Sequence, residues 1–200
     1  GRRASVSGEA DTGLTPGCRS EVARRTAIVR DAWSRQVNGV VRTLHTIQGE
    51  LERMGHPVKV ISPDLYGSIP CPTYPEIRLA LVRSSVVGHE IAAFRPDAVH
   101  LATEGPLCVA ARRWCLRSGV PFTTAYHTHF PDYVAQRTGL PASWFWRYIR
   151  WFHGPAQAVL VSTRSVREQL RAHGVAKVRP WKALVKVISS VRLASPSSCW

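Results

Sequence analysis

Residues 26–62, TAIVRDAWSRQVNGVVRTLHTIQGELERMGHPVKVIS, contain the pattern that decides the fold. An apolar run at 26–30 predicts a β-strand, and a second apolar run at 58–62 predicts another. Between them, residues 40–54 place apolar side chains every three or four positions, which predicts an amphipathic helix. Strand, helix and strand in this order make a βαβ unit with parallel strands.

The same alternation continues along the chain. We expect four further helices and four further strands: helices 84–94, 106–118, 142–153 and 164–172, and strands 98–102, 122–127, 157–162 and a short one in 177–181. Five or six strands with helices between them predict an α/β fold, a doubly wound, Rossmann-like parallel sheet. The proline-rich stretch 63–79 is predicted to be a long loop, and a loop of that length in a compact domain is usually functional.

The two ends of the chain differ from the middle. Residues 1–25 show no hydrophobic periodicity, so we expect a disordered or non-native leader. Residues 182–200 contain five serines, two of the four lysines and no acidic residue, so we interpret them as an aberrant tail. The expected folded domain is therefore 26–181.

Composition narrows the class of protein. The net charge is +14, but the basic residues are scattered singly or in pairs, which argues against a nucleic-acid binder and suits anionic substrates or lipid. Five cysteines without a C-x-x-C motif indicate neither a disulfide framework nor a zinc knuckle. No apolar run approaches the length of about 18 residues that spans a bilayer. We therefore expect a cytoplasmic protein that has, at most, peripheral contact with the inner face of the membrane.

Polar segments follow the predicted strands. They are residues 31–39, 62–64, 103–105 and 126–132. Because open parallel sheets bind ligands at the carboxyl ends of their strands, we expect the functional site there. The sequence contains neither G-x-G-x-x-G nor G-x-x-x-x-G-K-[ST], which argues against a standard NAD-binding domain and against a P-loop enzyme.

Five segments in the same order resemble a known family. They are DAWSRQVNGVVRTL, GHPVKVISPD, FRPDAVHLATEGPLCVAARRWC, PFTTAYHTHFPDYVAQRTGLP and FHGPAQAVLVSTRSVREQL. Together, residues 26–181 resemble the N-terminal, acceptor-side domain of family 4 glycosyltransferases of the GT-B fold. The resemblance is greatest to bacterial GDP-mannose-dependent α-mannosyltransferases and their glycolipid-synthesising relatives.

The resemblance implies an activity. It implies transfer of a hexose, with mannose favoured, from a nucleotide sugar to a lipid or glycan hydroxyl, with retention at the anomeric carbon. GDP-mannose is the favoured donor, and no metal or other cofactor is expected. In this family an Arg/Lys pair and an E-x₇-E motif of a C-terminal domain hold the donor, and this sequence contains neither in a recognisable form. We therefore expect the 200-residue chain to be inactive alone.

The resemblance also implies site residues. Gly39, with Asn38 beside it, would let the donor diphosphate approach the start of helix 40–54, where a missing Cβ and free N–H groups suit a phosphate. His127 matches the family's active-site histidine, and its ring could donate a hydrogen bond to a sugar hydroxyl while another group fixes its tautomer. Without the family, Asn38 and Gly39 would be read as an ordinary strand-to-helix turn.

Four further residues are candidates for the acceptor side of the cleft: Glu104, Asp31, Tyr133 and Arg137. Glu104 precedes a predicted helix, so capping that helix is its alternative role. Tyr133 and Arg137 are explained equally well by a solvated helix face. Arg30 and Arg35 stand where the family usually has Thr and Pro, which bears on the geometry of the phosphate loop.

Three other interpretations remain open. His127, His129 and Glu104 could form a metal site, the chain could be a stand-alone binding module for anionic lipid or a partner protein, or it could bind nucleic acid. Helix 142–153 interleaves aromatic residues with arginines, which suits a membrane interface or core packing. We expect His100 to be buried, Cys108 and Cys115 to pack on one helix face, and the remaining histidines, at 45, 56, 89, 153 and 173, to lie at the surface or in turns.

Overall fold

A computed structural model describes residues 23–31, 39–71, 74–127 and 141–184. Its centre is a six-stranded sheet in the order β2-β1-β5-β6-β7-β8, and every neighbouring pair of strands is parallel. The strands are β1 (Thr26–Val29), β2 (Val58–Ile61), β5 (Ala98–Leu101), β6 (Phe122–Tyr126), β7 (Val159–Val161) and β8 (Val178–Pro180). The predicted doubly wound α/β sheet is confirmed.

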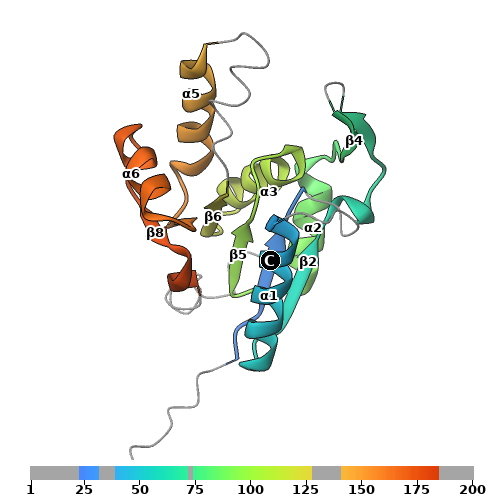
Figure 1. Ribbon diagram of the computed structural model, residues 1–200. Helices are drawn as coiled ribbons and strands as arrows, with labels where there is room; N and C mark the ends of the chain where they lie inside the picture. The colour runs from blue at the N-terminus through green and yellow to red at the C-terminus, as the bar shows by residue number, and fades with distance from the viewer. Residues whose placement is uncertain (1–22, 32–38, 72–73, 128–140, 185–200) are drawn as a thin grey trace, which may run out of the picture.

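Helices cover both faces of this sheet (Figure 1). They are α1 (Gly39–Arg53), α2 (Ser84–Phe94), α3 (Pro106–Arg117), α5 (Ala142–His153) and α6 (Arg164–Ala172). Their bounds lie within one residue of the predicted ones. At the start of α6, Thr163 caps the first turn because its hydroxyl accepts a hydrogen bond from the amide of Val166.

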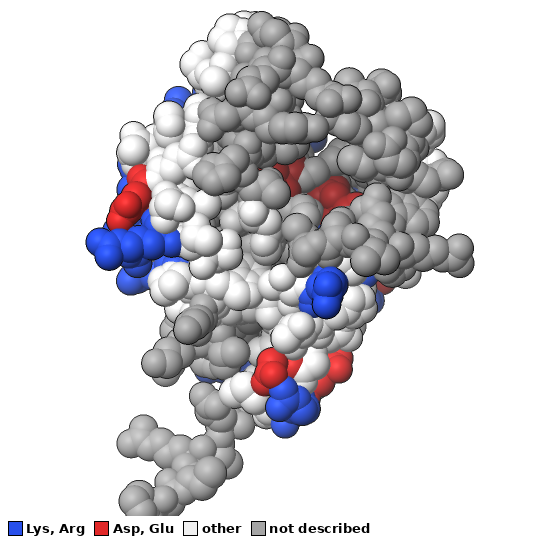
Figure 2. All heavy atoms as spheres, viewed as in Figure 1, with Lys and Arg blue, Asp and Glu red and all other residues white. Residues whose placement is uncertain are grey.

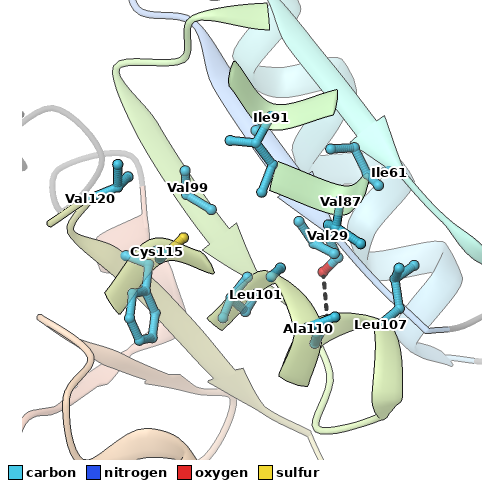
Figure 3. Close-up of a cluster of buried hydrophobic side chains, with 14 of the residues drawn as sticks. Val29, Ile61, Val87, Ile91, Val99, Leu101, Leu107, Ala110, Cys115 and Val120 are labelled. Atoms are coloured by element: carbon cyan, nitrogen blue, oxygen red, sulfur yellow. Dashed lines mark hydrogen bonds between the residues drawn. The ribbon is translucent and has the colours of Figure 1, made fainter. Parts of the chain in front are cut away.

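Alternation along the strands sends side chains to two separate cores. On one face, Ala27 and Val29 of β1 pack with α2 and α3, and Figure 3 shows this core with Val29, Val99 and Leu101 facing Val87 and Ile91. Cys108 and Cys115 of α3 are both fully buried in it, which confirms their predicted packing role. The other face carries Ile28, which packs against Leu44 of α1.

The second face is completed by the short 3₁₀ helix η2 (Trp181–Ala183) and the residue after it. Trp181 packs against a cluster that includes Ala125 of β6, Leu160 of β7 and Leu184. Leu184 is only 3% exposed, so packing of the domain continues three residues beyond the predicted end at 181.

The described part of 63–79, which was predicted to form a loop, contains regular secondary structure, so that prediction is wrong. They form the 3₁₀ helix η1 (Pro63–Leu65) and an antiparallel pair of strands, β3 (Ile69–Cys71) and β4 (Tyr74–Leu79). Pro70 of β3 and Pro75 of β4 are tolerated because each strand of this pair has a single neighbour among the described residues, so an N–H facing away from the ladder is not required.

The strand order reverses between β1 and β5. The chain passes from β1 to β2 on one side of β1, and β5 then pairs with β1 on its other side. The loops that leave β1 and β5 therefore run in opposite directions, which opens a crevice at the carboxyl ends of these two strands. This is the topological switch point where open α/β sheets bind ligands.

Candidate active site

The switch point gathers most of the described candidate residues. Asp31 follows β1, Glu104 follows β5 and His127 follows β6, so all three lie at the carboxyl edge of the sheet. Gly39 is the first residue of α1, the helix at whose start the sequence analysis expected the donor diphosphate. Asn38, Tyr133, Arg137, Arg35 and His129 lie outside the described residues.

Asp31 holds the start of α3. Its Oδ1 accepts a hydrogen bond from the Leu107 amide at 2.7 Å, and its Oδ2 accepts one from the Cys108 amide at 3.3 Å. The Thr103 hydroxyl donates to Oδ2 and accepts from the Asp31 amide, each at 2.8 Å. A carboxylate in the loop after β1 therefore caps a helix more than seventy residues later in the chain.

This packing also explains the glycine before α3. A Cβ added to Gly105 would lie 2.4 Å from Cγ of Asp31, so a side chain at position 105 would displace the carboxylate. Burial raises the pKa of the Asp31 carboxyl, and the hydrogen bonds from Thr103 and from the amides of Leu107 and Cys108 oppose that rise. Since both carboxylate oxygens accept hydrogen bonds, Asp31 serves first to fix the loop after β5 against β1.

Glu104 does not cap α3, so that interpretation is wrong, because Asp31 occupies the cap. Its Oε1 lies 3.4 Å from Nε2 of His153, and its backbone carbonyl accepts a hydrogen bond from the Tyr148 hydroxyl. Burial, with the Glu104 carboxylate as the next cause, raises the pKa of Tyr148 well above its usual value. Glu104 thus joins the loop after β5 to α5.

His153 is a residue that the sequence interpretation missed. It was expected at the surface, but it is 1% exposed, and its Nδ1 lies 2.8 Å from Oγ1 of Thr124. The expectation is wrong for His56 as well, since that side chain is 2% exposed and its Nδ1 accepts from the Arg24 amide. Helical spacing could have placed His153 correctly, because it lies four residues after Ile149 on the buried face of α5.

His127 lies at the end of the central strand β6 with one ring nitrogen engaged. The ring bonds to the backbone of Ala102, while Nε2 is buried and has no hydrogen-bond partner among the described residues. We therefore assign Nδ1 as the donor to the Ala102 carbonyl. Burial lowers the pKa of His127, and the Glu104 carboxylate partly opposes this, so the ring is neutral at physiological pH.

A neutral ring protonated at Nδ1 presents Nε2 as an acceptor. The sequence-based expectation that this ring donates to a sugar hydroxyl therefore reverses: Nε2 would accept a hydrogen bond from the hydroxyl. The edge of the ring also contacts Trp181, with the two centroids 5.0 Å apart. The imidazole is therefore held on two sides, and its buried Nε2 has no hydrogen-bond partner among the described residues.

His100 is buried beneath this site, as predicted. It is fully buried, its Nδ1 lies 2.8 Å from Oγ1 of Thr123, and its ring contacts Trp181. Burial, followed by the nearby His127, lowers the pKa of His100 to about 3. His100 is therefore neutral throughout the physiological range and supports the floor of the site.

The lowered pKa of His100 predicts acid sensitivity. Between about pH 6.5 and pH 3 the unfolded chain binds a proton at this position and the folded chain does not, so stability falls as the pH falls. From pH 7 to pH 5 this group removes about 2 kcal/mol of the free energy of unfolding. Urea unfolding of wild type and His100→Gln at both pH values tests this, since the glutamine keeps a polar group near Thr123. An equally large drop in both proteins would contradict the assignment.

Arg30 is the second residue that the sequence interpretation did not place. It is 5% exposed at the end of β1, and its Nε has no hydrogen-bond partner among the described residues. Because side chains alternate, Arg30 lies on the α1 side with Ile28, opposite to Asp31. Burial lowers the pKa of Arg30, and the Asp64 carboxylate opposes this, so a buried guanidinium lies at the switch point on the face covered by α1.

The aromatic residues of α5 divide between core and surface. Trp146 and Phe152 are buried, whereas Trp144 is 61% and Trp151 is 42% exposed. The Arg112 guanidinium lies over the Trp151 ring, 4.0 Å from its centroid. Core packing therefore explains part of the aromatic pattern, and two tryptophans of α5 remain at the surface.

Charge is distributed unevenly over the surface. On the face drawn in Figure 2, the described Lys and Arg side chains form separate groups, and acidic side chains lie beside several of them. The described part of this face therefore carries no continuous basic stripe.

Among the described residues, no three His, Cys, Asp or Glu side chains gather as metal ligands, and His129 of the metal-site alternative lies outside them. No described helix is long and apolar enough to cross a membrane.

The fold and the position of the site define a class, a doubly wound α/β domain with its site at the carboxyl edge of a parallel sheet. Within that class, the profile of Glycosyltransferase Family 4 matches residues 37–182. This is most of the chain, and it includes α1, the loop after β5 and His127. The chain therefore belongs to glycosyltransferase family 4.

Curated relatives agree with this assignment. The chain is 29% identical over 178 residues to the sulfoquinovosyl transferase SQD2 of Arabidopsis thaliana, covering 80% of this chain and 34% of that protein. It is also 29% identical over 184 residues to a GDP-mannose-dependent alpha-mannosyltransferase of Mycobacterium tuberculosis, covering 82% of this chain and 48% of that protein. A protein of the same name in Mycolicibacterium smegmatis is 27% identical over 176 residues, which cover 78% of this chain and 47% of that protein. The chain thus spans half or less of the length of these relatives.

Proposed function

We propose that this chain is the acceptor-side half of a retaining glycosyltransferase. The enzyme would move a hexose, with mannose favoured, from a nucleotide sugar to a lipid or glycan hydroxyl, with GDP-mannose as the favoured donor. The observation that carries the proposal is the unpartnered Nε2 of His127 at the switch point of a family 4 domain. A buried acceptor nitrogen with no partner among the described residues is costly unless a ligand supplies the missing hydrogen bond.

The residues at the switch point have complementary roles in this proposal. His127 accepts a hydrogen bond from a hydroxyl of the transferred sugar and holds the sugar against the sheet edge. Asn38 and the backbone at Gly39 approach the donor diphosphate, and the buried Arg30 adds a positive charge on the same side of the sheet. Glu104 faces the acceptor, and no metal is required by this arrangement.

Transfer would proceed by departure of the diphosphate from the same face of the sugar that the acceptor hydroxyl approaches. The leaving group gains negative charge as its bond to the anomeric carbon breaks, so stabilisation by nearby positive groups is the main catalytic contribution. In the resemblance, the principal positive groups belong to a C-terminal donor-binding domain. We therefore expect little or no transfer by the 200-residue chain alone.

Donor binding tests the proposal without requiring turnover. Saturation-transfer NMR of GDP-mannose with the purified chain should show contact with the sugar protons at millimolar affinity. His127→Ala should weaken this contact about tenfold, because one buried hydrogen bond is lost. His45→Ala, at an exposed position on α1, is the matched control and should leave the contact unchanged.

Two results would contradict the proposal. Absence of any contact between GDP-mannose and the chain would remove the donor role, and equal contact in wild type and His127→Ala would remove His127 from the site. Detectable sugar transfer by the chain alone would overturn only the expectation that it is inactive.

Co-sedimentation with anionic vesicles tests the proposed peripheral membrane contact through residues 142–153, which rests on exposed Trp144 and Trp151.

A further inference from the structure

A groove of about 1090 Å³ runs between α2 and α3. These two helices cover the core on the sheet face opposite to α1 (Figures 1 and 3), and residues of both line the groove. At one end it reaches Glu104 and Tyr148, which belong to the network described above at the carboxyl edge of the sheet. Nothing in the proposed donor site uses the rest of this groove.

Three arginines line the groove: Arg83, Arg113 and Arg117. All three are exposed, and among the described residues none of them forms an ion pair with a carboxylate. Arg117 donates a hydrogen bond to the Ser84 hydroxyl, which brings its guanidinium to the start of α2. No side chain of the described residues caps the first turn of α2, so its amides add to the positive field there.

Three guanidinium groups without an ion pair among the described residues suit an anion. Guanidinium groups bind carboxylate and phosphate through paired, charge-assisted hydrogen bonds, and they do so best in a concave site that limits access of water. The single acidic residue in the lining is Glu104, at the far end from Arg117. A carboxylate at that position excludes an anionic group but accepts hydrogen bonds from hydroxyls.

The spacing of these groups sets the size of the ligand. Arg113 follows Pro106 by seven helical positions, which places it about 10 Å along α3 from the Glu104 end. A free phosphate cannot reach both ends, whereas a sugar or polyol joined to an acidic group can. Between the ends, Val109, Ala110 and Trp114 provide an apolar wall for the faces of such a ring.

The geometry points to this groove as the binding site for an anionic, polyhydroxylated acceptor headgroup. The phosphate or carboxylate lies between Arg113 and Arg117, and a hydroxyl lies at Glu104, close to His127 and so to the transferred sugar. The inference rests on the proposed function, because it identifies the groove ligand with the acceptor. It adds a chemical class of acceptor and three residues, Arg83, Arg113 and Arg117, that the family resemblance does not assign.

Binding of glucose 6-phosphate to the full chain, measured by isothermal titration calorimetry at low salt, tests the inference. Arg113→Gln and Arg117→Gln should each weaken binding about tenfold, because each removes a charge-assisted hydrogen bond. Arg164→Gln is the matched control, because it removes one exposed arginine from α6, away from the groove. The melting temperature of each variant confirms that these surface changes leave the fold intact.

A second arm identifies the source of the headgroup. Vesicles of phosphatidylcholine with phosphatidylglycerol are compared with vesicles of phosphatidylcholine alone. Binding to the anionic vesicles that depends on Arg113 supports the site and assigns it to a lipid, whereas binding of glucose 6-phosphate alone supports the site and assigns it to a free acceptor.

Two outcomes overturn the inference. One is absence of binding to both probes, and the other is equal weakening by Arg113→Gln and Arg164→Gln, which would show attraction to net charge only. The contact of GDP-mannose with His127 is measured separately and should be unchanged in Arg113→Gln. Loss of the donor contact with intact binding in the groove would therefore count against the proposed function and leave the anion site standing.

Discussion

Replacement of Asp31 with alanine is expected to lower the free energy of unfolding by about 4 kcal/mol. The change removes the acceptor for the Leu107 amide, the Cys108 amide and the Thr103 hydroxyl at once. Each donor left without a partner in a buried position costs about 1–3 kcal/mol. The start of α3 and the loop after β5 depend on this one carboxylate, so the loss is large for a single side chain.

Chemical denaturation of Asp31→Ala measures this loss, and Asp97→Ala is its control. Asp97 also accepts a hydrogen bond from a backbone amide, that of Arg25 at 2.7 Å, but it does so at an exposed position. We expect Asp97→Ala to cost about 1 kcal/mol, the usual net contribution of one hydrogen bond. If the two variants were equally destabilised, Asp31 would not be the buried support of the site.

Asp31→Asn separates charge from shape. An asparagine has nearly the same volume but only one acceptor oxygen, so its NH₂ group would face either the Leu107 amide or both the Cys108 amide and the Thr103 hydroxyl. It should therefore lose most of the stability that Asp31→Ala loses, although it leaves no cavity. Recovery of full stability by asparagine would indicate that packing, rather than acceptance of hydrogen bonds, explains the role of Asp31.

The sequence predicted those parts of the fold that depend on local periodicity. Helix 84–94, helix 142–153 and helix 164–172 occur with the predicted bounds, because apolar side chains recur at helical spacing in each. The carboxyl edge was also predictable, since parallel strands place their following loops together. For this reason, the sequence alone predicts that Glu104 and His127 lie in the same region of the fold.

Features that depend on contacts distant in sequence could not be predicted. Nothing local to Asp31 indicates that it caps α3, and the expected cap, Glu104, instead faces His153 of α5. The paired strands β3 and β4 were hidden by prolines, which an isolated pair of strands tolerates. The sheet face on which Arg30 lies could have been read from alternation along β1, but its burial depends on the elements around it.

Gly88 provides the second large expected effect. Replacement with alanine should lower the free energy of unfolding by about 3 kcal/mol, the upper range for overpacking of a core. A Cβ at this position would lie 2.0 Å from Cδ1 and 2.2 Å from Nε1 of the Trp114 ring. Neither α2 nor the indole could keep its place, so the two helices would have to separate.

The predicted loss of stability in Gly88→Ala is opposite to the change that helix propensity predicts. Alanine in the middle of a helix is favoured over glycine by about 1 kcal/mol, so helix propensity alone predicts a more stable protein. Gly49 of α1 supplies the control, because a Cβ there meets no atom within 4 Å. We therefore expect Gly49→Ala to stabilise the chain by about 0.5–1 kcal/mol and Gly88→Ala to do the opposite.

A double-mutant cycle identifies the cause. Trp114→Ala alone should destabilise the chain by loss of packing, but in its presence Gly88→Ala should cost little, because the ring that it would strike is absent. A coupling energy near zero would show that the clash is not with Trp114. Because Trp114 also forms the apolar wall of the α2–α3 groove, a displaced ring should at the same time weaken binding of glucose 6-phosphate. Gly88→Ala would then lower both the free energy of unfolding and the affinity for glucose 6-phosphate, whereas Gly49→Ala would leave the affinity unchanged.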